Sequence, residues 1–320
     1  MALKDGKEPV DVIALDELPA ELGVFIEEMA QGTGALYGEE AAEEYRQQAP
    51  ALFQANLENQ SAGLLASVTP DGACTGLLLM LLDDGLGRVG LVHVRTPFRG
   101  ADHEQALGRA AVAVLRGAGA ERILFHFLPL CELNLEPALT ALGFWTAPHL
   151  LMGVDLEEAP WAAGEPETSR PLTQYDIPRA AAIIAAAYRD HPARNIDREV
   201  QDPDNAARFL ALAQNGGYGR VEPGWLRVLE REGELTGVAV AAQAAPGVGF
   251  LIQLAVAPEC QGSGTGKTLL RDMGRAFRVD GYSRMALGVL ASNPARKLYD
   301  NHGFHILRHV DTHVWQRPNS

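Results

Sequence analysis

The sequence predicts an α/β fold that occurs twice along the chain. Short apolar runs typical of buried strands alternate with longer amphipathic segments typical of helices. The chain also repeats itself: Val94 aligns with Val256 and Leu107 with Leu269, both 162 positions apart, and Gly143-Phe144 aligns with Gly303-Phe304, 160 positions apart. A repeat of this length indicates two copies of a domain, because the repeats of solenoid proteins span only about 20 to 50 residues.

The first copy is expected to begin with helices and to continue with a strand hairpin. The expected elements are an apolar segment at 10–15, helices at 18–29 and 39–57, strands at 62–68, 76–82 and 90–94, a helix at 102–116, a strand at 122–127 and a short helix at 136–142. Pro70-Asp71-Gly72 separates the first two strands and has the composition of a turn. We therefore expect these two strands to pair.

An acidic segment at 155–169 with Pro160, Gly164 and Pro166 is typical of a linker. It would separate a first domain at 1–154 from a second at 170–320. The elements expected in the second domain are a helix at 173–188, an irregular polar segment at 190–205, strands at 225–230, 238–242 and 250–256, a helix from Lys267 through Phe277 and a strand at 285–289. Asp176 as a cap and Pro178 in the first turn favour the start of the first of these helices.

A glycine-rich turn follows the strand at 250–256. Pro258 ends this strand, because proline has no N–H group for a sheet ladder. Gly262, Gly264 and Gly266 alternate in the turn, which lets the chain bend tightly and leaves backbone N–H groups exposed before the helix begins at Lys267. Unpaired N–H groups and the helix dipole favour an anion at this end of the helix. The turn therefore predicts a site for a phosphate or pyrophosphate.

One alternative for this turn is a P-loop, since Gly266-Lys267-Thr268 fits the end of G-x-x-x-x-G-K-[ST]. The first glycine of that motif would be residue 261, which is Gln261. Only about fifty residues follow the turn, too few for the rest of a nucleoside triphosphatase core. We therefore favour another phosphate-bearing ligand.

The turn resembles the acyl-CoA signature of the GNAT superfamily of N-acetyltransferases, Q/R-x-x-G-x-G/A after a strand that ends in V-x-P. The segment from Gln261 to Gly266 matches each required position, and Val256 and Pro258 precede it. A second block follows in the order of the family: Ser292-Asn293-Pro294-Ala295-Arg296-Lys297-Leu298-Tyr299, similar to its asparagine and A-x-x-L-Y helix, and then Gly303-Phe304. The resemblance implies two tandem GNAT-like domains, each with a mixed, mostly antiparallel sheet flanked by helices.

The resemblance also implies an N-acetyltransferase that binds acetyl-CoA as co-substrate and passes the acetyl group directly to a primary amine of a small molecule or peptide. The implied cofactor-binding residues are Gln261, Gly262, Ser263, Gly264, Thr265, Gly266 and Lys267 for the pyrophosphate, Leu254, Ala255 and Val256 for the pantetheine amide, and Asn293. Tyr299 is the implied catalytic acid that protonates the leaving thiolate. Because Asn293 lies one residue closer to Tyr299 than is usual in the family, Ser292 is an alternative to it.

The proton acceptor for the amine is not identified by the resemblance. Many relatives have a glutamate on the strand before the asparagine, whereas this chain has Leu287-Gly288-Val289. The polar candidates that remain are Asp190, His191, Glu222 and, through a water molecule, Gln253. The missing glutamate favours a second hypothesis, a non-catalytic acyl-CoA-binding sensor or regulatory module, whereas the presence of Tyr299 favours catalysis.

The first copy departs from the signature. The alignment of the copies places Arg99 at Gln261, Gly100 at Gly262, Asp102 at Gly264 and Glu104 at Gly266, while Thr140 and Ala141 stand in the region of Tyr299. The missing glycines remove the open turn, and two carboxylates at its mouth would repel a pyrophosphate. We therefore expect a degenerate domain that does not bind CoA and that acts as a scaffold or shapes the substrate site.

The composition limits the classes of function and the compartments that we expect for this chain. With 320 residues, of which 47% are hydrophobic, the chain is long enough for two domain cores, and its net charge of −14 argues against non-specific nucleic-acid binding. The first residues are charged, and no run of about eighteen apolar residues exists, so we expect a cytoplasmic protein that does not bind membranes.

No metal is expected, although His302, His305, His309 and His313 are close in sequence, because they belong to several elements. Cys74, Cys131 and Cys260 are expected to be plain thiols.

Overall fold

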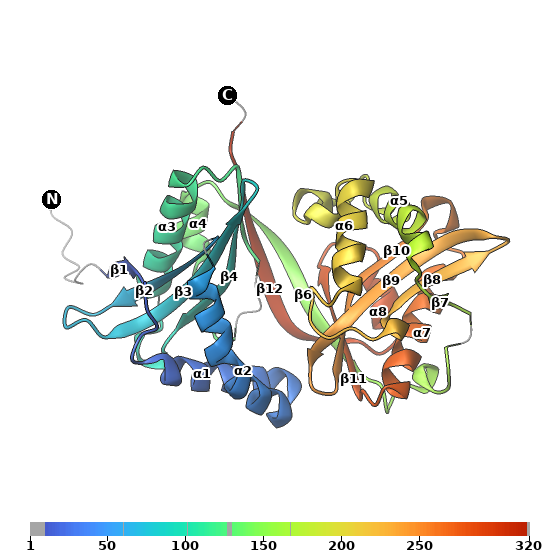
Figure 1. The fold of residues 1–320 in the computed structure, drawn as a ribbon, viewed down its shortest axis with the longest axis horizontal. Helices are drawn as coiled ribbons and strands as arrows, with labels where there is room; N and C mark the ends of the chain where they lie inside the picture. The colour runs from blue at the N-terminus through green and yellow to red at the C-terminus, as the bar shows by residue number, and fades with distance from the viewer. Residues whose placement is uncertain (1–9, 60, 101, 127–129, 167, 319–320) are drawn as a thin grey trace. The chain divides into compact units, whose positions relative to one another are not determined.

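A computed structural model describes residues 10–59, 61–100, 102–126, 130–166 and 168–318. The chain forms two compact units (Figure 1). The first unit consists of the chain up to Ala147 together with the segment from Val310 onward, and the second consists of Pro148–His309.

The sheet of the first unit has the strand order β1-β2-β3-β4-β5-β12. Its strands are β1 (Asp11–Ala14), β2 (Ala62–Val68), β3 (Cys74–Asp83), β4 (Leu86–Val94), β5 (Arg122–Phe125) and the end of β12 (His305–Gln316). Neighbouring strands are antiparallel except β4 and β5, which are parallel. The pairing of β2 with β3 confirms the expected hairpin, and β2 has the predicted bounds.

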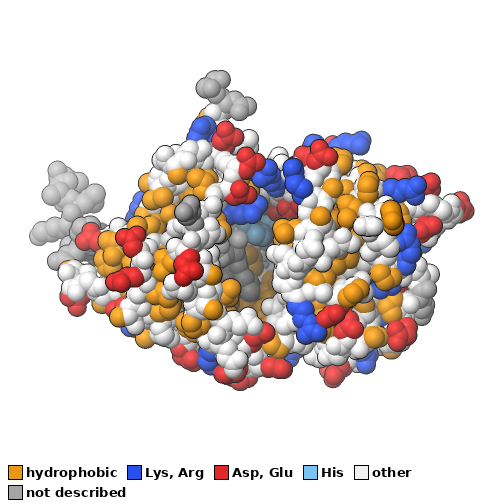
Figure 2. Space-filling model, viewed as in Figure 1, with side chains coloured by type: hydrophobic (Ala, Val, Ile, Leu, Met, Phe, Trp, Pro, Cys, Tyr) orange, Lys and Arg blue, Asp and Glu red, His pale blue; other side chains and the backbone are white. Residues whose placement is uncertain are grey.

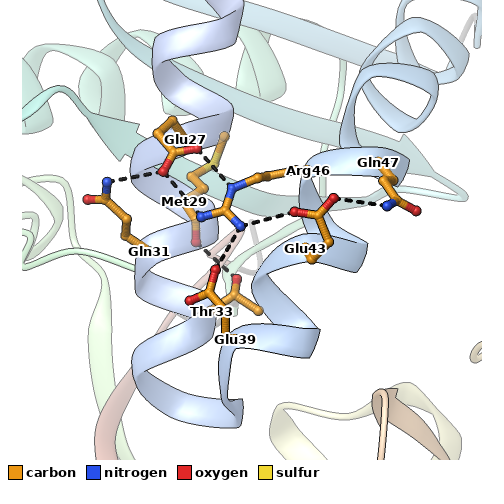
Figure 3. Close-up of polar contacts among 8 residues, drawn as sticks. All are labelled: Glu27, Met29, Gln31, Thr33, Glu39, Glu43, Arg46 and Gln47. Carbon is orange, nitrogen blue, oxygen red and sulfur yellow. Dashed lines mark hydrogen bonds and ion pairs between the residues drawn. The ribbon is translucent and has the colours of Figure 1, made fainter.

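Helices cover both faces of this sheet. They are α1 (Leu22–Tyr37), α2 (Glu39–Glu58), α3 (Asp102–Gly117) and α4 (Glu136–Ala141). Because successive strand residues point to opposite faces, Leu64 packs with α1 and α2 whereas Leu65 packs with α3 and α4. At the surface, Arg46 of α2 holds Glu27 of α1 through two hydrogen bonds of 2.9 and 3.2 Å and also reaches Glu39 and Glu43 (Figure 3).

The second unit repeats this plan with the strand order β7-β8-β9-β10-β11-β6. Its strands are β7 (Arg170–Pro171), β8 (Leu226–Arg231), β9 (Glu234–Ala245), β10 (Val248–Val256), β11 (Arg284–Leu290) and β6 (Trp145–Asp155), and its helices are α5 (Ile177–Ala187), α6 (Pro203–Gln214), α7 (Thr265–Val279) and α8 (Arg296–Asp300). Only β10 and β11 are parallel. Val238 and Val240 of β9 pack with α5 and α6, whereas Ala239 and Ala241 pack on the other face with α7 (Figure 1).

Each unit takes its sixth strand from the other half of the sequence. In the first unit, β12 pairs with β5 from His313 to Gln316, and in the second unit β6 pairs with β11 from His149 to Asp155. The units therefore differ from the expected domains at 1–154 and 170–320, and the expected linker at 155–169 lies within the second unit. Local patterns could not reveal this exchange, because strand pairing joins segments that are far apart in sequence.

The end of the expected linker is held by a buried carboxylate. Asp272 of α7 is 1% exposed and accepts hydrogen bonds of 2.7 Å from both the backbone N–H and the hydroxyl of Ser169. Arg227 of β8, also buried, donates to the same hydroxyl over 2.7 Å. These contacts fix the chain where β7 begins.

The helix predicted at 173–188 is a 3₁₀ turn at Gln174–Asp176 followed by α5, and Asp176 immediately precedes α5 without a side-chain cap hydrogen bond to it. The helix α6 was not predicted. Thr173 and Asp176 form a capping box in the 3₁₀ turn before α5. The polar segment at 190–205 was expected to be irregular, and it does contain two 3₁₀ turns, but Asp202 caps α6 by accepting a hydrogen bond of 2.8 Å from the N–H of Asn205. The predicted strand at 122–127 ends at Phe125 in β5, and its last residue lies outside the described ones.

The described helices do not include one that is both long enough and apolar enough to cross a membrane. On the face drawn in Figure 2, lysine and arginine side chains are interspersed with aspartate and glutamate.

Candidate functional site

The glycine-rich turn between β10 and α7 has the backbone that only glycine adopts readily. Gly262 and Gly264 have positive φ angles of 79° and 90°, and Gly264 is the residue that immediately precedes α7. A Cβ atom at either position would meet no other atom within 4 Å. The positive φ angles, and not crowding, therefore require glycine here.

This turn presents backbone donors without partners. Among the described residues, the N–H groups of Gly262, Gly264 and the three residues from Thr265 to Lys267 donate no hydrogen bond, and the helix ladder begins with Thr268 N–H and Gly264 O at 3.0 Å. The Ser263 hydroxyl lies 3.0 Å from that of Thr265 and donates to the Cys260 carbonyl over 2.6 Å, so both hydroxyls shape the turn. Free N–H groups at the positive end of a helix dipole form a site for an anion.

Beside the turn, β10 and β11 diverge. They pair only from Val248 to Leu251 of β10, although β10 continues to Val256. The register of β10 against β9 shifts between Leu251 and Gln253, so Ile252 is an extra, bulged residue. From Leu254 to Val256, β10 therefore pairs with β9 on one edge, and no described strand pairs with its other edge.

A pocket lies in this opening and is lined from both faces of the sheet. Its polar lining residues are His149, Tyr188, His191, Asp197, Gln253, Asn293 and Tyr299. Tyr188 follows α5 and also packs against the core on that face, whereas Tyr299 of α8 belongs to the core on the α7 face. Two reactants bound on opposite faces of the sheet could therefore meet through the opening.

Tyr299, the predicted acid, points its ring into this buried environment. It is 7% exposed, and its ring centroid lies 5.7 Å from that of Phe304. Burial raises the pKa of Tyr299 well above its ordinary value, so the phenol keeps its proton at neutral pH. A protonated hydroxyl in a pocket can donate to a group that becomes negative.

A second tyrosine, Tyr188, shares the pocket and was not predicted. Its hydroxyl donates to Gln253 Oε1 over 3.2 Å. Burial above all raises the pKa of Tyr188, and the electrostatic interactions with Tyr299 and Asp197 add to this shift. Its position at the end of the helix predicted at 173–188 does not distinguish this residue from other helix-end tyrosines.

Only some of the candidate proton acceptors line the pocket. Asp190 and Glu222 do not line it, and Glu222 binds Arg220 at 2.8 Å. The Nδ1 atom of His191 accepts a hydrogen bond of 3.1 Å from the N–H of Ala193, and burial lowers the pKa of this histidine. In its neutral form His191 therefore carries its proton on Nε2, which makes that nitrogen a donor.

Two lining residues were missed because of where they lie in the sequence. Asp197 belongs to the polar segment at 190–205, in which only Asp190 and His191 were candidates, and it is the only carboxylate among the lining residues. His149 lies on β6, which the sequence analysis assigned to the first domain, and pairs with Leu290 at the end of β11. Only the strand exchange brings it to this pocket.

Asn293 lines the same pocket and also shapes the chain. Its Oδ1 atom accepts a hydrogen bond of 2.8 Å from the N–H of Ala295, and its own N–H donates to Leu290 O over 2.9 Å. This turn leads from β11 into α8. The alternative residue, Ser292, is exposed and does not line the pocket.

The corresponding loop of the first unit is closed by its own side chains. Arg99 has φ and ψ of −65° and 143°, nearly the same as Gln261 with −65° and 142°. Glu104 is 1% exposed, and its Oε1 atom accepts a hydrogen bond of 3.0 Å from the N–H of Gly100. Arg99 donates to Val94 O over 3.0 Å and pairs with Glu28 at the same distance. A carboxylate of the chain thus occupies the place that an anion takes in an open loop.

Metal-binding residues do not gather at either site. The described part of the chain contains no group of three or more His, Cys, Asp or Glu side chains that could hold a metal ion. All three cysteines are free thiols, and burial raises the pKa of Cys74 to about 11.

Comparison with known proteins agrees with this geometry. Residues 181–304 match the model of the Acetyltransferase (GNAT) family. A sequence comparison with curated proteins found no match.

Solved structures are similar over almost the whole chain. One is a GCN5-related N-acetyltransferase from Sphaerobacter thermophilus, with a TM-score of 0.65 and 19% identity over 97% of both chains. A second is a tandem GNAT protein from the clavulanic acid biosynthesis pathway, with a TM-score of 0.58 and 14% identity over 97% of this chain and 99% of that chain. A third is a GNAT-family acetyltransferase from Colwellia psychrerythraea, with a TM-score of 0.52 and 12% identity over 96% of this chain and all of that chain. This likeness confirms the predicted α/β fold of two tandem GNAT-like domains.

Proposed function

We propose that the chain is an N-acetyltransferase that transfers the acetyl group of acetyl-CoA to a primary amine of a small molecule or peptide. The pocket between the diverging strands β10 and β11 is the observation that carries this proposal, because it joins the two faces of the sheet next to an anion-binding turn. The match of residues 181–304 to the GNAT family model supports the same activity.

The residues around the turn fit the phosphate end of acetyl-CoA. The free N–H groups between Gln261 and Lys267 would bind its pyrophosphate, with the exposed Lys267 side chain adding positive charge. The free edge of β10 from Leu254 to Val256 offers backbone groups to the pantetheine amides. Asn293, at the start of the turn into α8, completes the proposed cofactor-binding set.

Two side chains would handle the protons of the reaction. Asp197 accepts a proton from the bound ammonium group, so that the amine nitrogen can attack the thioester carbonyl carbon. Tyr299 donates its proton to the sulfur as the carbon–sulfur bond breaks, and so the thiol leaves instead of the thiolate. Tyr299 belongs to the core on the α7 face, whereas Val200, in the segment that carries Asp197, packs in the core with α5 and α6 on the other face.

The alternative function is a non-catalytic acyl-CoA sensor, and one observation favours it. The strand β11 has Gly288 and its apolar neighbours where a catalytic glutamate is found in many relatives. Asp197 offers a carboxylate from another segment, which weakens this alternative.

The release of CoA with a panel of primary amines tests the proposal. Tyr299→Phe should lower kcat by about a hundredfold or more, because general acid catalysis contributes at least about that factor. Tyr282→Phe is the matched control, since Tyr282 is equally buried in the same unit but lies outside the pocket. Tight binding of acetyl-CoA with no turnover of any amine would leave the sensor as the function.

A further inference from the structure

One buried polar group in the pocket has no part in the proton transfers. Gln253 lies on β10 directly after the bulge at Ile252 and is 8% exposed. Its Nε2 atom is buried and forms no hydrogen bond with any described residue, whereas its Oε1 atom accepts the hydroxyl of Tyr188. An amide nitrogen has two N–H donors, and burying them without a partner is unfavourable. The free protein therefore holds two donors that a ligand can satisfy.

The hydrogen bond with Tyr188 determines which end of the amide faces the pocket. The hydroxyl of Tyr188 donates over 3.2 Å to the amide oxygen of Gln253, which accepts. The NH₂ group is therefore the end of the amide that Tyr188 does not hold, and Gln253 lines the space between β10 and β11. A group that binds there must be a hydrogen-bond acceptor.

The charges of the residues that line the pocket further restrict the chemical class of the ligand. The residues that line the pocket include Asp197 as their only carboxylate and contain no lysine or arginine. An ammonium group is therefore favoured, whereas a carboxylate or phosphate on the acceptor would be buried without a cation. Asp197 and Gln253 both line this pocket, so one small molecule can contact both side chains.

We propose that the acceptor substrate is an amine that carries an uncharged oxygen close to its nitrogen, as in a vicinal amino alcohol, and that Gln253 is the residue that selects it. The oxygen accepts a hydrogen bond from Gln253 Nε2 while the ammonium group faces Asp197. This inference rests on the proposed acetyltransferase function and adds the class of substrate to it.

Matched pairs of amines test this selection. The pairs are 2-aminoethanol with propylamine, and trans-2-aminocyclohexanol with cyclohexylamine, which differ mainly in one hydroxyl. The wild-type protein should show a kcat/KM about tenfold higher for the hydroxylated member of at least one pair, since one neutral hydrogen bond contributes about that factor. Gln253→Met should reduce this ratio to about one, mainly by raising KM for the hydroxylated amine.

The control is Gln243→Met. Gln243 of β9 accepts a hydrogen bond of 2.8 Å from Tyr282 in the same unit, so this variant loses a similar contact outside the pocket. It should keep the wild-type preference.

Three results would overturn the inference. A wild-type protein that does not distinguish the paired amines has no such selection. Equal losses for both members of a pair in Gln253→Met would mean that the amide acts on the acyl donor or on folding. Absence of CoA release with every amine, despite acetyl-CoA binding, would instead remove the proposed function on which the inference rests.

Discussion

At the scale of single residues, Gly264 combines a conformational and an electrostatic requirement. Its φ of 90° needs glycine, and a side chain there would have open space but would stand at the free N–H groups of the turn. Gly281 at the other end of α7 has a similar φ of 84° and similar open space. Substitutions at these two glycines therefore distinguish the effect of backbone strain from the effect of a side chain on anion binding.

Gly264→Glu should abolish acetyl-CoA binding, and Gly281→Glu should leave it nearly unchanged. Both variants strain the backbone, but only the first places a carboxylate at the N–H groups proposed to bind the pyrophosphate. Isothermal titration calorimetry with acetyl-CoA measures the difference. Equal binding by the two variants would contradict the assignment of this turn.

Asp197→Asn should slow acetylation at neutral pH, and the loss should shrink as the pH rises. If Asp197 removes the proton from the ammonium group, a substrate that is already neutral no longer needs it, and alkylamines lose their proton near pH 10. The ratio of kcat/KM for wild type and variant between pH 7 and about pH 9.5 measures this rescue. Asp190→Asn is the control, because Asp190 is exposed and outside the pocket. A deficit that stays constant with pH would point to a structural role.

At the scale of elements, the start of α5 depends on an ion pair whose strength varies with pH. Asp176 accepts hydrogen bonds of 2.7 and 2.8 Å from Arg170, and it also accepts the N–H and hydroxyl of Thr173. Arg170 above all, and then Thr173, hold the pKa of Asp176 far below its usual range although partial burial opposes the shift. The exposed Arg46 cluster of Figure 3 differs, because solvent screens its charges.

Asp176→Asn should destabilise the protein at neutral pH and should destabilise it by a smaller amount at about pH 3. The pKa is lowered in the folded state, so the carboxylate stabilises the fold fully above its unfolded pKa of about 3.9. This contribution begins to decline as the pH falls below that value, and it is lost only as the pH passes through the lowered folded-state pKa. Urea unfolding of both proteins at the two pH values measures the effect. A difference in unfolding free energy that is the same at both values would contradict it.

Elements defined by local patterns could be predicted, whereas those defined by long-range pairing could not. The turn at Gly262 and Gly264 and the capping box that Thr173 and Asp176 form before α5 are encoded within a few residues. The pocket opposite the turn combines Asp197, Tyr188 and His149, which come from a polar segment, a helix end and a strand of the other sequence half. None of these three residues belongs to a recognisable sequence motif. They come together only through the folding of segments that are far apart in the sequence.

At the scale of the whole molecule, one fold occurs twice with different loops. Val94 ends β4 as Val256 ends β10, and Leu107 and Leu269 are both fully buried in the helices that follow. The duplicated core is thus preserved while one loop keeps free N–H groups and the other satisfies its Gly100 N–H with Glu104. The sequence predicts repulsion at the mouth of the first loop, and the structure adds that the carboxylate of Glu104 is buried against the backbone of this loop.

The chain should bind one molecule of acetyl-CoA, and that count should not rise when Glu104 is changed. In Glu104→Gln the amide oxygen can still accept the N–H of Gly100, and Arg99 still occupies the carbonyl of Val94, so the first loop stays closed. Calorimetric titration of wild type and Glu104→Gln should therefore give one site per chain, and the same titration of Gly264→Glu should give none. Two sites in the wild-type protein would mean that the first unit opens its loop by releasing Glu104, and the two copies would then share the cofactor-binding role.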